Sequence, residues 1–197
     1  MDITFSLQDL TSLPSLVAFD TETTGLWAPS NRLVEIAGVK FRPGFGVVET
    51  FYELIDPERP IPREVISIHG ITDEMVAEAG SAGQVLRRFF DFCGPDVVLV
   101  AHNAPFDISF VWFELVRSGL PLPTNPVLDT CALSRDHVAG MSSYSLLSLC
   151  RQFDIAASQA HRALGDAELV AALFERLLSI LADRGDVDHS RPVSYTH

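Results

Sequence analysis

The stretch that decides the fold is Leu16-Val17-Ala18-Phe19-Asp20-Thr21-Glu22-Thr23-Thr24-Gly25-Leu26. Its four leading apolar residues predict a buried strand, and the acidic residues that follow mark where this strand reaches solvent. Side chains two positions apart on a strand point to the same face, so Asp20 and Glu22 should emerge side by side. Two adjacent carboxylates repel each other unless a cation lies between them. The stretch therefore predicts a candidate cation site at a strand end, although a solvated turn is the simpler explanation of an isolated acidic pair.

Outward from this strand, the apolar pattern predicts an α/β fold. Residues 32–41 and 47–55 read as two further strands joined by a turn at 42–46, which predicts an antiparallel hairpin, and residues 97–101 and 127–128 read as short strands. Helical periodicity and capping signals predict helices over 62–68, after Thr72, between Ser81 and Gly94, and over 105–118, 143–153 and 163–184. Early strands followed by alternating helices and strands imply a mixed central sheet with helices on both faces.

The length of 197 residues fits one domain, which we place at 15–184, after a lead-in at 1–14 and before a polar C-terminal tail at 185–197 that we expect to be loose. Three cysteines without a CxxC pair predict buried, reduced thiols and a reducing compartment. We find no signal peptide and no apolar run of about 20 residues, so we expect a cytoplasmic protein without a membrane partner.

The formal net charge of −12, with one lysine against thirteen arginines, argues against passive electrostatic binding to DNA. It does not exclude an enzyme that acts on nucleic acid, because bound divalent cations would supply local positive charge. The acidic balance predicts a weak grip on the substrate and favours a partner that holds it.

Two later segments also place polar groups at element ends. Asp107 follows Pro105 in the first turn of a predicted helix, where an acid can simply stabilise the helix dipole. His161 precedes Asp166 by five residues, just before the last helix; alone it would read as an exposed loop histidine, but histidine also suits proton transfer near neutral pH. Four carboxylates in all favour hard cations such as Mg²⁺ or Mn²⁺, and two such ions about 4 Å apart can act on a phosphodiester.

Three segments in this order resemble the exonuclease motifs of the DEDDh superfamily of 3′→5′ exonucleases. The first is 17–26, the second is Ala101-His102-Asn103-Ala104-Pro105-Phe106-Asp107, and the third is Ala160-His161-Arg162-Ala163-Leu164-Gly165-Asp166-Ala167. Ile68-His69-Gly70-Ile71-Thr72 is similar to an element of the epsilon proofreading subunit of bacterial DNA polymerase III and its relatives. The resemblance covers roughly residues 15–182 and implies a ribonuclease H-like fold.

The resemblance implies a two-metal-ion exonuclease that removes 5′-mononucleotides from a 3′ end. Asp20, Glu22 and Asp166 would hold two Mg²⁺ or Mn²⁺ ions, with Asp107 joining directly or through water, and His161 would be the general base. The spacing of His161 and Asp166 fits the histidine branch of the superfamily. Substrate contacts would come from Thr23, Leu26, Glu64, His69, His102, Asn103 and Phe106. Leu26 and Phe106 could equally be core residues, and Glu64 could be an exposed helix residue without a role.

Several alternatives stay open at this point. The motifs favour single-stranded or frayed DNA as substrate, but RNA-trimming relatives carry the same acids and histidine. A non-catalytic nucleic-acid-binding module on this fold is a second alternative. A phosphatase with a DxDxT-like opening is a third, disfavoured because the only lysine, Lys40, falls in a predicted strand. A polymerase or another replication partner is a candidate, although the chain ends soon after the last predicted helix and shows no clear clamp-binding segment.

Overall fold

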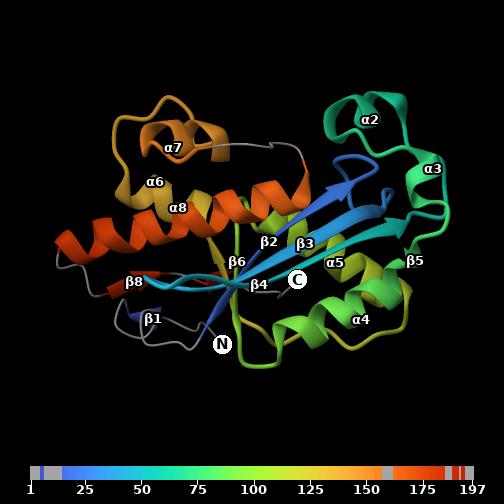
Figure 1. Cartoon of the computed structure of the whole chain (residues 1–197), viewed down its shortest axis with the longest axis horizontal. Coiled ribbons are helices and arrows are strands. Elements are labelled where there is room, and N and C mark those ends of the chain that lie inside the picture. The colour runs from blue at the N-terminus through green and yellow to red at the C-terminus, as the bar shows by residue number, and fades with distance from the viewer. Residues whose placement is uncertain (1–4, 7–14, 157–161, 185–187, 191, 194–197) are drawn as a thin grey trace.

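The computed structural model describes residues 5–6, 15–156, 162–184, 188–190 and 192–193. Within these residues, seven strands form one sheet in the order β5-β4-β3-β2-β6-β7-β9 (Figure 1). The strands are β2 (Leu16–Thr23), β3 (Leu33–Arg42), β4 (Gly46–Asp56), β5 (Gly80–Ser81), β6 (Val98–Ala101), β7 (Val127–Asp129) and β9 (Pro192–Val193). A separate antiparallel pair joins β1 (Phe5–Ser6) to β8 (Asp188–Ser190).

Strand β2 lies in the middle of this sheet. It pairs antiparallel with β3, opposing Asp20 to Ala37 and Glu22 to Glu35, and parallel with β6. Strands β3 and β4 form the expected antiparallel hairpin, whose register ends at Arg42 opposite Gly46. The prediction of a mixed sheet is therefore confirmed.

Helices cover both faces of the sheet. They are α2 (Arg63–His69), α3 (Asp73–Val76), α4 (Ala82–Cys93), α5 (Pro105–Arg117), α6 (Thr130–His137), α7 (Leu146–Gln152) and α8 (Ala163–Arg184). Figure 1 shows α8 lying along one face beneath α6 and α7, with α4 and α5 on the other face and α2 and α3 beyond the end of the sheet. The described chain is a three-layer α/β arrangement.

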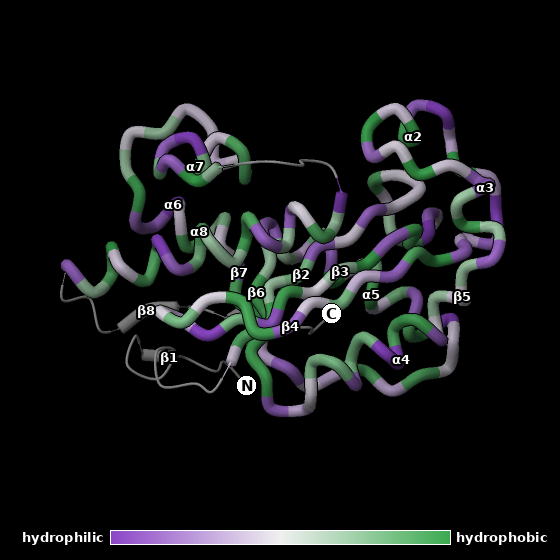
Figure 2. The backbone as a smooth tube through the Cα atoms, in the orientation of Figure 1, coloured by the Kyte–Doolittle hydropathy of each residue, from purple (hydrophilic) through white to green (hydrophobic). Residues whose placement is uncertain are grey.

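The alternation of side chains along β2 divides the core in two. Leu16 and Ala18 pack into a cluster with α8, whereas Val17 and Phe19 pack into a cluster with α4 and α5. Figure 2 shows the apolar stretches of β2 and β6 between these layers. Because the alternation continues past Phe19, the next acidic side chains of β2 belong to the α8 side of the sheet.

The structure differs from the sequence prediction in three places. Helix α6 was not predicted, because its sequence is mostly polar; Asp129 begins it by accepting a hydrogen bond from the N–H of Cys131 at 2.9 Å. Helix α7 spans 146–152 rather than 143–153. The tail that we expected to be loose contains β8 and β9, and β9 pairs with β7 at the edge of the main sheet.

The expectations for the cysteines and for membrane-spanning segments can be compared with the structure of the described residues. The three cysteines are free and buried, as predicted. Among the helices of the described chain, none combines the length and apolar character that crossing a membrane requires.

Candidate active site

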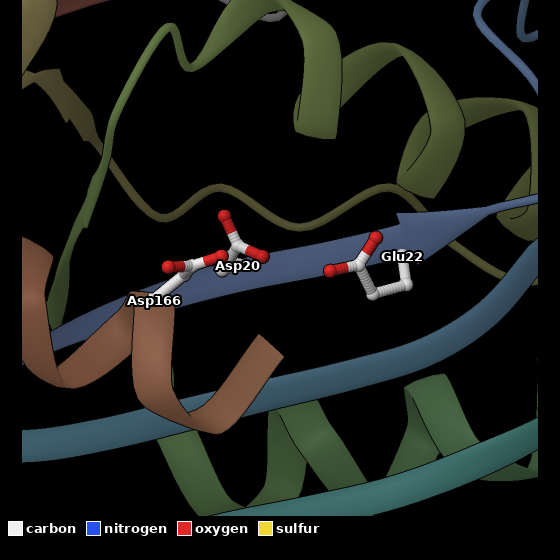
Figure 3. Close-up of side chains that lie close together, drawn as sticks. All are labelled: Asp20, Glu22 and Asp166. Carbon is white, nitrogen blue, oxygen red and sulfur yellow. The ribbon is translucent and has the colours of Figure 1, made fainter. Parts of the chain in front are cut away.

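Three carboxylates from two elements converge at the end of β2. Asp20 and Glu22 rise from the same face of the strand, and Asp166 reaches them from the first turns of α8 (Figure 3). One carboxylate oxygen of each lies within 4.8 Å of the others, and all three side chains are partly accessible to solvent. The predicted same-face pair is therefore present, and α8 completes it with a third acid.

Asp107 approaches the same place from the first turn of α5, next to Pro105. Its Oδ1 accepts hydrogen bonds from the Thr21 N–H at 3.1 Å and from the Thr21 hydroxyl at 2.6 Å. Thr21 separates Asp20 from Glu22 on β2, so these two bonds hold Asp107 beside the strand that carries both acids. Asp107 is buried and is not one of the three converging ligands.

The electrostatics of the metal-free site oppose full ionisation. Burial raises the pKa of Asp20 well above its usual value, and the charges of Asp107, Asp166, Glu22 and Glu35 raise it further. Burial and the neighbouring carboxylates, Glu35 first, raise the pKa of Glu22 to about 8. Burial also raises the pKa of Asp107 to about 7, against the opposing effect of the Thr21 hydrogen bonds. Clustered oxygen ligands that retain protons for lack of positive charge fit a divalent cation site.

These pKa shifts give a first prediction for the metal-free protein. The folded pKa values of Glu22 and Asp107 lie above their ordinary values of 4.5 and 3.8, so between pH 5 and 8 the folded state binds more protons than the unfolded state. The free energy of unfolding should therefore fall as pH rises through this range. The melting temperature measured in chelator should therefore drop as pH rises from 5 to 8, by about 2–4 °C for each kcal/mol lost in a domain of this size.

Saturating Mg²⁺ or Mn²⁺ should remove most of this pH dependence, because the cation replaces the bound protons. Glu22→Gln is the matched variant, since it removes one titrating group and keeps the size of the side chain. A chelated wild-type protein whose melting temperature stays level or rises from pH 5 to 8 would contradict the prediction.

A further group of residues at the start of α8 was missed by sequence reasoning. Glu35 is fully buried on β3 and accepts hydrogen bonds from Arg162 Nη2 at 2.6 Å and from the Ala163 N–H at 2.8 Å. Arg162 also donates to the Tyr52 hydroxyl on β4. A signal was available: Glu35 interrupts an apolar strand, and a charged residue is almost never fully buried without a partner.

The loop after β2 presents apolar side chains to solvent. Leu26 is 87% exposed and Trp27 is 67% exposed, so the reading of Leu26 as a core residue does not hold in the structure. The loop is nevertheless well bonded: Arg117 on α5 donates to the carbonyls of Ala28, Pro29 and Asn31. Leu26 is thus held at the surface, just beyond the carboxylates of β2.

Helix α2 brings His69 back towards the site. His69 is buried, and its Nδ1 accepts a hydrogen bond from the Ile71 N–H at 3.0 Å. Burial lowers its pKa, so the ring is neutral near pH 7 and carries its proton on Nε2. By hydrogen-bond geometry the buried Nε2 has no partner in the described part of the chain, although the Thr23 backbone lies close enough to raise the pKa of the ring. Glu64, in the first turn of the same helix, is exposed.

The other predicted contact residues have varied surroundings. Both ring nitrogens of His102 are engaged, one with the Thr130 hydroxyl at 2.9 Å and one with the Tyr144 carbonyl at 3.0 Å. Asn103 is exposed and adopts a left-handed backbone conformation with φ 62°. Thr23 and Phe106 are neighbours of Glu22 and Asp107 in the sequence. The Thr23 hydroxyl donates to the Gly25 carbonyl, and the partly buried Phe106 ring packs on Phe110.

His161, the predicted general base, lies outside the described residues, as do residues 157–160. Its predicted role therefore stays a prediction. Arg162, the next residue in the sequence, is described and is anchored on Glu35.

Comparison with known proteins places this arrangement in a family. A family model for exonucleases, RNase_T, matches residues 17–174, which include Asp20, Glu22, Asp107 and Asp166. The chain belongs to the RNase_T exonuclease family. The family is one of exonucleases, which sets the phosphatase alternative aside.

The curated relatives of this RNase_T domain include much longer proteins. The chain is 38% identical over 175 residues to DNA polymerase III PolC-type of Halalkalibacterium halodurans, and 37% identical over 172 residues to that of Bacillus subtilis. The matches cover 89% and 86% of this chain but 12% of each polymerase. The chain thus spans about an eighth of the length of these relatives.

Solved structures confirm the expected ribonuclease H-like fold and the resemblance to DEDDh exonucleases. Exonuclease X in complex with 5′ overhanging duplex DNA is 31% identical, with a TM-score of 0.69 over 86% of this chain and 93% of that one. The nuclease domain of 3′hExo, a DEDDh family member bound to rAMP, is 17% identical with a TM-score of 0.73 over 91% of this chain and 95% of that one. At 17% identity, the similarity to 3′hExo supports only the fold.

Proposed function

We propose that this RNase_T exonuclease is a two-metal-ion enzyme that removes 5′-mononucleotides one at a time from the 3′ end of DNA. The observation that carries the proposal is the convergence of Asp20, Glu22 and Asp166 within 4.8 Å at a strand end, with Asp107 beside them. The raised pKa values of Asp20, Glu22 and Asp107 explain why such a cluster needs positive charge to become fully ionised.

Each acidic side chain has a distinct place in this proposal. Asp20, Glu22 and Asp166 would hold two Mg²⁺ or Mn²⁺ ions, and Asp107, whose Oδ1 is occupied by Thr21, would contribute its other oxygen directly or through water. Bound divalent ions supply charge stabilisation to a phosphodiester under attack. His161 would take the proton from the attacking water, since a neutral imidazole is the usual base near pH 7.

The exposed and unpartnered groups around the cluster suit contacts with the terminal nucleotide. Leu26 offers apolar surface to a base, and stacking or packing of this kind tolerates any sequence. His69 offers its Nε2–H as a donor to a nucleotide oxygen. We keep Thr23, Glu64, His102, Asn103 and Phe106 as further proposed contacts; His102 would act by supporting the second motif, because both its nitrogens are already bonded.

DNA is the proposed substrate because the relatives at more than 30% identity point to it. Exonuclease X was solved with duplex DNA, and the PolC-type relatives are DNA polymerases. Digestion of matched single-stranded DNA, duplex DNA with a mismatched end and RNA oligomers tests this choice. Faster release of ribonucleotides than of deoxynucleotides would favour the alternative, an RNA-trimming exonuclease, and no release at all would favour a binding module.

The acidic charge of the chain favours a partner that holds the substrate. The PolC-type relatives suggest a DNA polymerase or another replication protein in that role, and a cytoplasmic location, where bacterial replication takes place. With so few basic residues, the chain alone should bind few phosphates and show a shallow dependence of affinity on salt.

The proposed site also predicts which DNA ends are cut. Because the carboxylate cluster is acidic, a 3′-phosphate should slow release of the first nucleotide by at least about tenfold, an unfavourable free energy of about 1.4 kcal/mol or more. A covalently closed single-stranded circle should survive. Release of labelled mononucleotides from 3′-hydroxyl, 3′-phosphate and circular versions of one oligonucleotide measures both effects, and rapid cutting of the circle would mean an endonuclease instead.

A further inference from the structure

Glu35 is a buried charge that the proposed chemistry does not use. It lies fully buried in β3 between Val34 and Ile36, which are also buried. Its Oε1 accepts from Arg162 Nε at 3.0 Å and Nη2 at 2.6 Å, and its Oε2 accepts from the Ala163 N–H at 2.8 Å. A buried carboxylate destabilises a protein unless it is paired in this way, so its presence in an apolar strand calls for a reason.

The start of α8 depends on this remote carboxylate. The Arg162 carbonyl accepts the first helical hydrogen bond, from the Asp166 N–H at 3.0 Å, which places Arg162 at the N-terminal cap. Arginine has no acceptor for the free N–H groups of a first helical turn, unlike serine, asparagine or aspartate. Glu35, 128 residues earlier in the chain, supplies that acceptor to Ala163.

The same contacts connect the two elements that carry the converging acids. Glu35 lies opposite Glu22 in the β2–β3 register, and Asp166 lies one turn after Arg162. The Arg162 guanidinium also bonds to the Tyr52 hydroxyl and lies over its ring, 5.8 Å from the centroid. Strands β3 and β4 therefore fix the first turn of α8 relative to β2.

We propose that Glu35 and Arg162 are positioning residues that hold Asp166 at the spacing from Asp20 and Glu22 at which the three bind divalent cations. The inference rests on the proposed function of the carboxylate cluster. Glu35 is not itself a ligand, because both its oxygens are engaged by Arg162 and Ala163. Groups that orient metal ligands in this way typically change metal affinity or activity by about 10–100-fold when they are replaced.

Glu35→Gln in the full chain tests the proposal. It keeps the shape and one acceptor but removes the charge that pairs with Arg162. We expect the midpoint of a direct Mn²⁺ binding titration to increase by about 10–100-fold, and kcat to fall by a similar factor when Mn²⁺ is held at the wild-type midpoint. The KM for an oligonucleotide should stay within about threefold, because Glu35 does not contact substrate.

Arg162→Lys is the second variant, and Glu114→Gln is the matched control. Lysine keeps the charge but not the two-pronged bond, so Arg162→Lys should shift the Mn²⁺ midpoint in the same direction by a smaller factor. Glu114 is also a fully buried glutamate, paired with Arg32 at 2.6 Å and Arg117 at 3.1 Å, but it has no contact with α8 among the described bonds. Glu114→Gln should lower the melting temperature without moving the Mn²⁺ midpoint.

Wild-type Mn²⁺ midpoints in Glu35→Gln and Arg162→Lys, or an equal shift in Glu114→Gln, would overturn the proposal. If Glu35→Gln does not fold, the comparison of the Mn²⁺ midpoints of Arg162→Lys and Glu114→Gln decides whether the proposal holds. The binding titration needs no turnover, so it separates two failures. A wild-type chain that binds Mn²⁺ without releasing nucleotides refutes the proposed function but still tests the positioning role, and a wild-type chain with no Mn²⁺ response overturns both.

Discussion

Asp20→Ala is expected to lower exonuclease turnover by at least about 10³-fold, because losing several kcal/mol of metal-based stabilisation costs a factor of ten for every 1.4 kcal/mol. The same change should raise the melting temperature of the metal-free protein. Asp20 carries a charge conflict within the cluster, because burial and the charges of Asp107, Asp166 and Glu22 all raise its pKa. Removing it relieves repulsion that protonation or a bound cation otherwise relieves.

The measurement pairs mononucleotide release with thermal unfolding in chelator and in Mg²⁺. Wild-type protein should be inactive in chelator and gain stability with metal, whereas Asp20→Ala should be inactive in both and gain little. Asp91→Ala is the control, since it removes an exposed carboxylate from α4 on the opposite face of the sheet. Substantial turnover in Asp20→Ala, or full wild-type activity in chelator, would rule out the two-metal proposal.

His161→Ala is expected to lose roughly 10²–10⁴-fold in turnover, the usual contribution of a positioned general base. Metal binding should be largely retained, because Asp20, Glu22, Asp107 and Asp166 remain. In the wild type, activity should rise with pH through the neutral range, since a base must be deprotonated and the ordinary pKa of histidine is about 6.5. That rise should be lost in the variant.

Comparing turnover with metal affinity in the same His161→Ala protein distinguishes the interpretations. An exposed loop histidine without a role predicts no change in either quantity, and the base would then have to be sought elsewhere. If metal affinity collapses together with turnover, His161 is a ligand or a support and not the base. Loss of turnover with metal affinity preserved is the outcome that the proposal requires.

Much of the fold was readable because its signals are local. The apolar run before Asp20 predicted β2, the turn at 42–46 predicted the β3–β4 hairpin, and Ser81 with Gln84 predicted the start of α4, where the capping box is present. Helix α6 escaped because two of its four buried residues, Thr130 and Ser134, are polar, and apolar periodicity is a weak signal in a short polar helix.

Some features of the candidate site could likewise be predicted from local sequence, and others could not. Asp20 and Glu22 share a face because they are two residues apart on a strand, which sequence alone dictates. The order of the motifs predicted that Asp166 would join them. The structure shows that one oxygen of each of the three carboxylates lies within 4.8 Å of the others. The bond from Thr21 to Asp107 spans 86 residues, and no local pattern contains it.

The sequence by itself determined the strand that carries the acids, the mixed α/β class and the family, because these depend on residue type and short-range spacing. Only the tertiary structure decided that Glu35 on β3 begins α8 and pairs with Arg162. The physical reason is that a buried ion pair stabilises a protein only when distant segments bring both charges and their hydrogen-bond partners together, and that proximity is a property of the folded chain.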